Sequence, residues 1–174
     1  MGEPRLPAIR RYIDTDYEAV RDLFVRVNRE LAPPHLKDTF EGYIGRSLAE
    51  EIERIPAYYG ERRGSFWVAT EKSKIVGMFG LERSDSATAE LRRMYVDPRA
   101  RRRGIARRML AFAEDAARRD ECLLMVLSTS ELQPDAISLY RNSGYRLVRE
   151  EHRAEQTNKT IGGGIRRFYF EKNL

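Results

Sequence analysis

An arginine-rich segment at residues 96–109 contains the residues whose types and spacing most clearly suggest chemistry. It reads Val-Asp-Pro-Arg-Ala-Arg-Arg-Arg-Gly-Ile-Ala-Arg-Arg-Met, a turn and a glycine followed by apolar residues at helical spacing. The first N–H groups of a helix have no intrahelical partners and attract anions, and a glycine lets an anion approach the backbone closely. The segment therefore predicts a binding site for a di- or polyphosphate. The side chains that would add charge and forked donors are those of Arg101, Arg102, Arg103 and Arg107.

Two well-known phosphate loops do not fit this segment. A Walker loop needs Lys followed by Ser or Thr after its last glycine, but Ile105 and Ala106 follow Gly104. The dinucleotide fingerprint needs three glycines, and only one is present. An arginine-rich loop that merely precedes an ordinary surface helix remains the alternative interpretation.

Length and composition restrict the class of protein. We expect one domain over residues 1–174, because 174 residues with 41% hydrophobic and 34% charged residues are typical of a single globular unit. No apolar run approaches the ~18 residues of a membrane span, so no membrane partner is expected. The first ten residues lack an apolar signal, and the one cysteine, Cys122, excludes an internal disulfide, so we expect a cytoplasmic protein. The net charge of +5 favours an anionic partner, either a phosphorylated cofactor or RNA.

Hydrophobic periodicity and turn residues divide the chain into alternating elements. Alternating or continuously apolar segments predict strands at residues 8–13, 65–70, 75–82, 87–96, 122–127, 145–148 and 165–172. Helical spacing predicts a helix that begins at Asp14 or Thr15 and ends at Pro33, a second over residues 37–58 that Pro56 breaks, and two more over residues 103–119 and 134–142. Residues 58–64 are expected to form a loop, and residues 152–164, which end in three glycines, a mobile one.

Two motifs in this arrangement resemble those of the GCN5-related N-acetyltransferases. Residues 101–106 fit the family's Arg/Gln-x-x-Gly-x-Gly/Ala pattern and follow Met-Tyr-Val-x-Pro. Residues 136–145 are similar to its second signature, Ala-x-x-Leu/Phe-Tyr-x-x-x-Gly-Phe/Tyr. The resemblance is specific from about residue 90 to residue 145. It implies a single α/β domain ordered β-α-α-β-β-β-α-β-α-β-β, with a mixed, mostly antiparallel sheet of about seven strands and a parallel, splayed central pair.

The resemblance also implies a cofactor, acetyl-CoA, and the residues that would bind it. The pantetheine arm would pair with the backbone of residues 94–96, and the pyrophosphate would bind the N–H groups of residues 102–107. Gln133 stands where the family often has an asparagine, so its contact with pantetheine is an expectation of lower weight. The implied cofactor-binding set is Met94, Tyr95, Val96, Arg101, Arg102, Arg103, Gly104, Ile105, Ala106, Arg107 and Gln133.

Two side chains are candidates for proton transfer. Tyr140 matches the family tyrosine that protonates the departing CoA thiolate, and a phenol with a pKa near ~10 holds a proton at neutral pH. A ring that only packs in a helix interface is the alternative. Glu90 lies fourteen positions before Gly104, the spacing of the glutamate general base in histone-acetylating relatives. The alternatives are a structural carboxylate paired with Arg92 or Arg10, or proton removal by water; Glu82 is a weaker candidate base.

These residues predict direct acetyl transfer from acetyl-CoA to an amine acceptor, most simply a small molecule held between the first two helices and residues 152–164. A protein or aminoacyl-tRNA acceptor and a non-enzymatic acyl-CoA-binding module remain alternatives. A nucleic-acid partner is disfavoured because the arginines are concentrated in one loop. A homodimer through the last strands is left open. Two histidines and one cysteine, far apart in sequence, predict no metal site.

Overall fold

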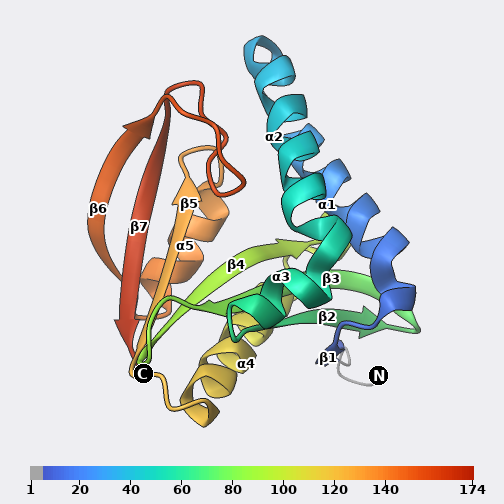
Figure 1. Ribbon diagram of the computed structural model, residues 1–174, viewed down its shortest axis with the longest axis vertical. Coiled ribbons are helices and arrows are strands. Elements are labelled where there is room, and N and C mark those ends of the chain that lie inside the picture. The colour runs from blue at the N-terminus through green and yellow to red at the C-terminus, as the bar shows by residue number, and fades with distance from the viewer. Residues whose placement is uncertain (1–5) are drawn as a thin grey trace.

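A seven-stranded mixed sheet forms the centre of the protein (Figure 1). The computed structural model describes residues 6–174; residues 1–5, which begin the predicted domain, lie outside the described residues, and the single domain over 1–174 stays a prediction. The strand order is β1-β2-β3-β4-β5-β7-β6, with β4 and β5 parallel and the other neighbours antiparallel, which confirms the predicted fold. The strands are β1 (Ala8–Arg11), β2 (Ser65–Glu71), β3 (Lys74–Arg83), β4 (Thr88–Val96), β5 (Leu124–Ser130), β6 (Arg146–Arg153) and β7 (Ile165–Asn173).

Helices cover both faces of this sheet. They are α1 (Tyr17–Leu31), α2 (Lys37–Glu50), α3 (Ile55–Glu61), α4 (Ile105–Arg119) and α5 (Pro134–Asn142). The apolar stripes of α1, α2 and α3 bury Phe24, Phe40 and Tyr59 against one face of the sheet. The stripe of α4 buries Ile105 and Met109 in a second core cluster on the other face, to which α5 also contributes. Figure 1 shows α1 and α2 side by side on one side of the molecule and β6 and β7 on the other.

The second helical region differs from its sequence prediction. It breaks at Glu51, and Pro56 lies in the first turn of α3 instead of ending a helix. Proline suits this position because the N–H groups of the first turn have no intrahelical partner. Tyr58 and Tyr59, expected in a loop, lie in α3 and are 3% and 2% exposed. Burial of two aromatic rings extends the helical region beyond the point that the local sequence suggests.

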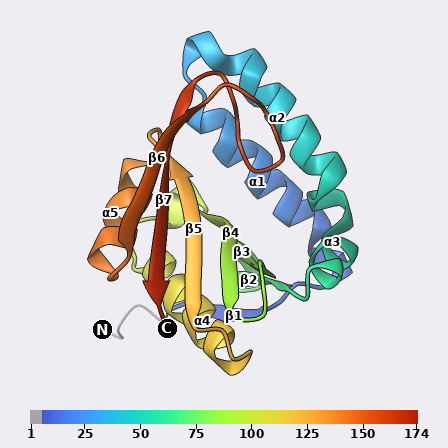
Figure 2. The ribbon, with the colours of Figure 1, turned by 60° about the vertical axis from the view of Figure 1, so that its left-hand side comes forward.

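Residues 154–164 connect β6 and β7 and contact the helical layer; residues 152 and 153, predicted to begin the loop, end β6, and the mobility of the loop stays a prediction. The Gln156 side chain donates to the carbonyl oxygens of Thr39 on α2 (2.8 Å) and Ile161 (3.2 Å), and Ile161 is buried. The glycines at 162–164 all have positive φ, between 66° and 80°, so they form a backbone turn back into β7. In Figure 2 this loop lies across α1 and α2.

The two parallel strands separate after a short contact. β4 pairs with β5 only at Thr88, Ala89 and Glu90, and the last register pair is Glu90 with Val126. Beyond this point the edge of β4 that faces β5 has no strand partner among the described residues, as Figure 2 illustrates. Its backbone groups are therefore free to pair with a ligand. No helix within residues 6–174 has the length and apolar character needed to cross a membrane.

Candidate active site

A β-bulge in β4 shapes the site. Gly80 pairs with Arg92 and Met78 pairs with Tyr95, so Arg93 and Met94 together face a single residue of β3. Arg93 has a φ of 53°, a left-handed conformation that a side-chain-bearing residue rarely adopts. The bulge breaks the alternation of the strand, and Arg92 and Arg93 both direct their side chains to the α2–α3 face.

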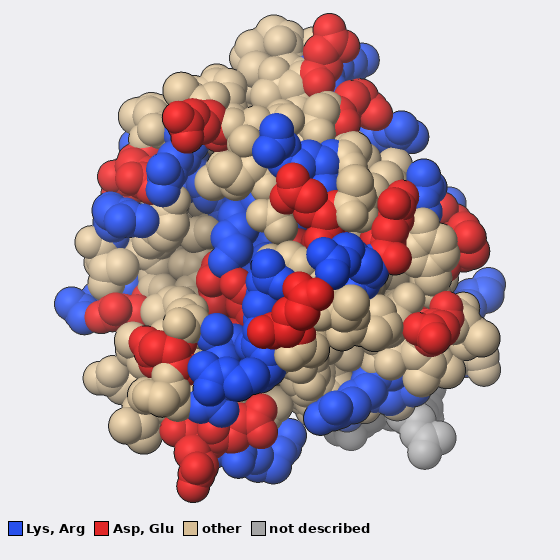
Figure 3. Space-filling view, viewed as in Figure 1, with Lys and Arg blue, Asp and Glu red and all other residues tan. Residues whose placement is uncertain are grey.

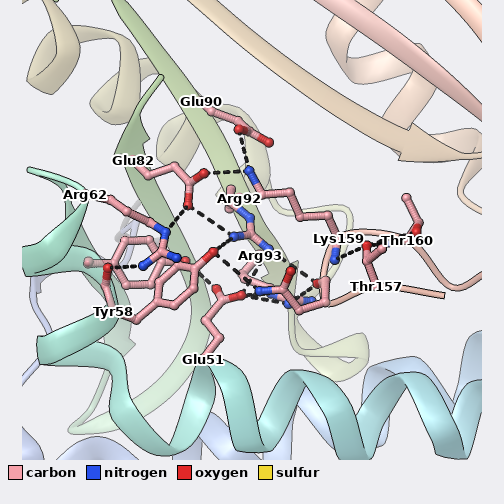
Figure 4. Close-up of polar contacts among 12 residues, drawn as sticks. Glu51, Tyr58, Arg62, Glu82, Glu90, Arg92, Arg93, Thr157, Lys159 and Thr160 are labelled. Carbon is pink, nitrogen blue, oxygen red and sulfur yellow. Dashed lines mark hydrogen bonds and ion pairs between the residues drawn. The ribbon is translucent and has the colours of Figure 1, made fainter. Parts of the chain in front are cut away.

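Glu51 is the carboxylate that these two arginines bind. It is fully buried, and its Oε2 lies 2.7 Å from Arg93 Nη2 and 3.0 Å from Arg92 Nη2 (Figure 4). The Tyr59 hydroxyl donates to Oε1 at 2.6 Å. Burial alone would raise the pKa of Glu51, but Arg93 and then Arg92 outweigh it, so its pKa lies below the ordinary value. The cluster fixes the bulge and with it the wall of the site.

Two further carboxylates lie beside this cluster, and together they bind an ammonium group. Lys159, from the β6–β7 loop, places Nζ 2.6 Å from Glu82 Oε1 and 2.9 Å from Glu90 Oε2 (Figure 4). Burial would raise the pKa of Glu82, but Arg92 and Lys159 lower it below its ordinary value. Burial would lower the pKa of Lys159, but Glu90 and Glu82 raise it. Glu82 and Lys159 therefore stay ionised in this arrangement.

Glu90 forms its ion pair with Lys159, not with Arg92 or Arg10, the two partners that the sequence suggested. Arg92 binds Glu51 and Glu82, and Arg10 binds Asp16, so neither forms an ion pair with Glu90. The bulge and the register of β4 place Arg92 over α3, which directs its guanidinium toward Glu51 and Tyr58. Glu90 is left facing the loop, where only Lys159 reaches it among the described residues.

A cavity lies where β4 and β5 separate, and it brings together residues from distant parts of the sequence. Glu90, Tyr140 and Gln133 all line it. Met94 and Tyr95 from β4 also line it, whereas Val96 packs in the core beside α4. The other lining residues include Ser128 and Thr129 of β5, Arg167 of β7, and Lys159 of the β6–β7 loop.

Tyr140 projects from α5 into this cavity and is 5% exposed. Its ring packs against Tyr145 and Phe170 at centroid distances of 5.8 Å and 5.9 Å. Burial, and then the neighbouring Tyr95, raise the pKa of Tyr140 well above its ordinary value. The ring thus packs in the core while its hydroxyl keeps a proton that it can donate in a hydrogen bond.

The predicted phosphate site lies at the N-terminus of α4. Gly104 has a φ of 76°, precedes the first helical residue, and has open space where a side chain would begin. No side chain caps the helix. Its first N–H groups are therefore available to an anion. Ile105 is buried and anchors this turn, and Ala106 beside it is half-buried.

The four arginines around this turn are not equivalent. Arg103 Nη1 lies 3.1 Å from Glu71, and Arg101 Nη2 lies 3.8 Å from Glu30. Arg102 and Arg107 are exposed and form no ion pair with a described residue. The two pairs hold the flanks of the turn, and two arginines remain for a ligand.

Sequence reasoning missed three charged residues of the site: Glu51, Lys159 and Arg167. Each is an unremarkable polar residue in the sequence, and no motif or spacing distinguishes it. The alternation of β7 indicates only that Arg167 lies on the opposite face from Phe168 and Phe170. Among residues 6–174, no group of three or more His, Cys, Asp or Glu side chains has the arrangement of a metal site.

Comparison with known proteins agrees with this geometry. Residues 62–147 match the acetyltransferase (GNAT) domain. The match identifies these residues as a GNAT acetyltransferase domain, and proteins of this family use acetyl-CoA. The matched residues run from the end of α3 to the start of β6 and so include the bulge, the α4 turn and Tyr140.

Two curated proteins and one solved structure illustrate the similarity. The chain is 36% identical over 110 residues to an N-acetylaspartate synthetase from Danio rerio, covering 62% of this chain and 39% of that protein. It is 31% identical over 116 residues to N-acetyltransferase 8 from Homo sapiens, and the match covers 63% of this chain and 51% of that protein. The chain thus spans about half or less of the length of these curated relatives. The PaiA N-acetyltransferase from Thermoplasma acidophilum, solved in complex with coenzyme A, shares the fold with a TM-score of 0.74 at 18% identity, covering 96% of this chain and 98% of that one.

Proposed function

We propose that this GNAT protein transfers the acetyl group of acetyl-CoA directly to the amine of a small molecule. The observation that carries the proposal is that Glu90 and Tyr140, one from β4 and one from α5, line the same cavity at the point where β4 and β5 separate. A base and a hydrogen-bond donor on two sides of one cavity are what acyl transfer from a thioester to an amine requires. The name of the zebrafish relative, an N-acetylaspartate synthetase, also favours a small acceptor.

The cofactor would enter from the α4 side. The pyrophosphate would accept hydrogen bonds from the uncapped N–H groups at residues 102–107 and contact Arg102 and Arg107. The pantetheine arm would pair with the free edge of β4 at Met94, Tyr95 and Val96. Gln133 accepts a hydrogen bond from the Thr129 hydroxyl through its Oε1, so its amide NH₂ is the group left for the arm.

In the proposed reaction the acceptor ammonium first loses a proton to Glu90, directly or through water. The neutral amine attacks the thioester carbonyl and the C–N bond forms. The C–S bond then breaks, and the proton that the attacking nitrogen still has to lose passes to the departing sulfur, directly or through water, so that the products are an amide and a free thiol. Tyr140 stabilises the departing sulfur by donating a hydrogen bond. Its raised pKa makes complete proton transfer to a thiolate unfavourable, because a thiol ordinarily has a pKa near ~8.5. Thiol positioning is therefore the larger part of its proposed role.

Two other acceptor classes have less support. Figure 3 shows Lys and Arg interleaved with Asp and Glu over the face that it presents, without a continuous basic surface of the kind that tracks a nucleic-acid backbone. A tRNA-linked acceptor would make activity fall steeply with salt. A non-enzymatic acyl-CoA-binding module would bind the cofactor and release no thiol with any amine.

Two further properties belong to the proposal. We place the protein in the cytoplasm because its single cysteine, Cys122, is buried and free. β6 is the last strand of the sheet, so a homodimer would form most simply by pairing β6 with its copy. Size-exclusion chromatography with light scattering measures that association.

The decisive experiment measures cofactor binding and turnover separately. Thermal-shift and calorimetric titrations with acetyl-CoA should show binding, and release of free thiol against an amine panel should show transfer. Glu90→Gln should lower kcat/KM and leave the dissociation constant for acetyl-CoA unchanged. Absence of acetyl-CoA binding at millimolar concentration would refute the proposal, and binding without thiol release would leave only the binding module.

A further inference from the structure

Arg167 differs from the other cationic side chains of the cavity because it has no acidic partner. Arg92 and Arg93 are neutralised by Glu51 and Glu82, and Lys159 binds Glu82 and Glu90. Arg167 also lines the cavity, but the only hydrogen bond of its side chain to a described residue runs from Nη2 to Ser128 Oγ at 2.7 Å. No described carboxylate lies within ion-pair distance of it.

The acidic residue nearest along the sheet is engaged elsewhere. Glu151 on β6 lies opposite Arg167 in register, but its carboxylate binds Arg153 at 2.7 Å and Arg149 at 3.4 Å. The Nε atom of Arg167 is buried and has no hydrogen-bond partner within residues 6–174. The Nε atom of Arg166 is in the same state, so this atom does not distinguish Arg167. With one side-chain hydrogen bond and no carboxylate partner, the guanidinium of Arg167 retains donors that a ligand in the cavity can use.

The other end of the cavity has the opposite charge character. Glu90 lines this end, and Glu82, which is not among the lining residues, contacts the same ammonium group of Lys159, so the two carboxylates together form an ammonium site. Lys159 comes from a loop and its side chain is 41% exposed, so withdrawal from this position does not require unfolding of the core. The acceptor amine would take the same two carboxylate contacts.

The two ends of the cavity lie on a short stretch of the sheet. Glu90 pairs with Val126 on β5, and Ser128, which holds Arg167, lies two residues further on the same strand. Strands lie ~4.8 Å apart and rise ~3.3 Å per residue, so the backbones at Glu90 and Ser128 are separated by ~8 Å. The side chains of Glu90 and Arg167 both line the same cavity above this stretch, so one small molecule can contact both.

We propose that the acceptor is a free amino acid, whose ammonium group binds Glu82 and Glu90 and whose carboxylate binds Arg167. The inference rests on the proposed function and specifies the substrate class of the same site. The forked guanidinium suits a planar carboxylate, and Ser128 holds it in place. Arg167 then distinguishes an amino acid from an amine of the same size that lacks the acid group.

The test compares each amino acid with its carboxamide, which keeps the shape and the amine but removes the negative charge. Thiol release is measured with acetyl-CoA and both members of each pair, and kcat and KM are determined separately. We expect kcat/KM to be at least tenfold higher for one or more amino acids than for the matching amides. Arg167→Gln should remove that preference, mainly through KM, and Arg167→Lys should restore part of it because the charge remains without the fork.

Arg166→Gln is the matched control. Arg166 is the neighbouring arginine, and it binds Glu150 and Glu131 outside the cavity. Its variant should keep the preference for amino acids. Equal turnover of amino acids and amides, or an equal loss for both in Arg167→Gln, would overturn this inference while leaving the acetyltransferase proposal intact. Failure to bind acetyl-CoA or to acetylate any amine would overturn both.

Discussion

Lys159 Nζ lies 2.9 Å from Glu90 Oε2, although 69 residues separate the two in the sequence. The contact joins the β6–β7 loop to the strand that carries the proposed base. A cation at this distance stabilises the ionised carboxylate and, at the same time, occupies the place where the acceptor ammonium would bind. Changes at Lys159 should therefore affect both the pH dependence of the reaction and the affinity for the acceptor.

Lys159→Met should move the acid limb of the kcat/KM profile to higher pH. Lys159 is one of the cations that hold the pKa of Glu82 below its ordinary value, and its removal raises that pKa, so Glu82, one of the two carboxylates proposed to bind the acceptor ammonium, ionises at a higher pH. At high pH the KM for the acceptor should be lower in Lys159→Met than in the wild type, because the ammonium group of Lys159 no longer competes for the two carboxylates. Lys74→Met, at an exposed position of β3, is the control and should leave the profile unchanged. An unmoved acid limb would contradict the role given to Lys159.

Tyr140→Phe should lower kcat by about 10- to 100-fold, the low end of what a positioned proton donor supplies. The hydroxyl makes no hydrogen bond to a described residue, so its loss should leave the melting temperature and the dissociation constant for acetyl-CoA nearly unchanged. Pre-steady-state thiol release separates chemistry from product release. Tyr145→Phe is the matched control: its hydroxyl donates to Glu114, away from the cavity. A Tyr140→Phe enzyme with full kcat would show that the ring only packs.

Arg102→Gln and Arg107→Gln should each raise the KM for acetyl-CoA by about tenfold, since a charge-assisted contact contributes about 1.5–3 kcal/mol when it is not screened. Arg101→Gln should have a smaller effect, because Arg101 lies near Glu30 and is partly neutralised. Steady-state kinetics at several salt concentrations measures this difference, and the wild-type KM should show the steeper salt dependence. Equal effects at Arg101, Arg102 and Arg107 would place the phosphates differently.

Glu51→Gln should destabilise the fold by about 3–5 kcal/mol, as expected when a buried ion pair loses one partner and the other charge stays buried. Arg92 and Arg93 would remain without their shared carboxylate. Urea denaturation measures the loss. Glu41→Gln on α2 removes an exposed ion pair with Arg29 and should cost much less. A Glu51→Gln protein as stable as the Glu41→Gln protein would contradict the structural role of the cluster.

The wild type and Glu51→Gln should also differ in how their stability depends on pH. The folded-state pKa of Glu51 lies below its ordinary value, so its contribution to stability is present above the unfolded-state pKa of ~4.3 and is lost as the pH falls through the folded value. The free energy of unfolding of the wild type should therefore fall more steeply below pH ~4 than that of Glu51→Gln. Parallel curves for the two proteins would show that Glu51 is not the titrating group.

Local patterns determined the elements and the cofactor side of the site. The alternation of β2, β3 and β4, the apolar stripe of α4 and the glycine before it are properties of neighbouring residues, so the sequence indicates the sheet, the helix and the α4 turn. The break at Glu51 instead of Pro56 was not predictable in this way, because the burial of Tyr58 and Tyr59 that extends α3 depends on packing against β2 and β3.

The tertiary structure alone decided the proposed acceptor side of the site. Glu51, Lys159 and Arg167 come from α2–α3, the β6–β7 loop and β7, and no spacing in the chain relates them. The bulge at Arg93 and the register of β4 turn two consecutive arginines onto one face, and the β6–β7 loop delivers Lys159 to Glu90. Charges act through distance in space, so the sequence supplied these groups, and only the folded chain determined which were neutralised and which, like Arg167, remained for a ligand.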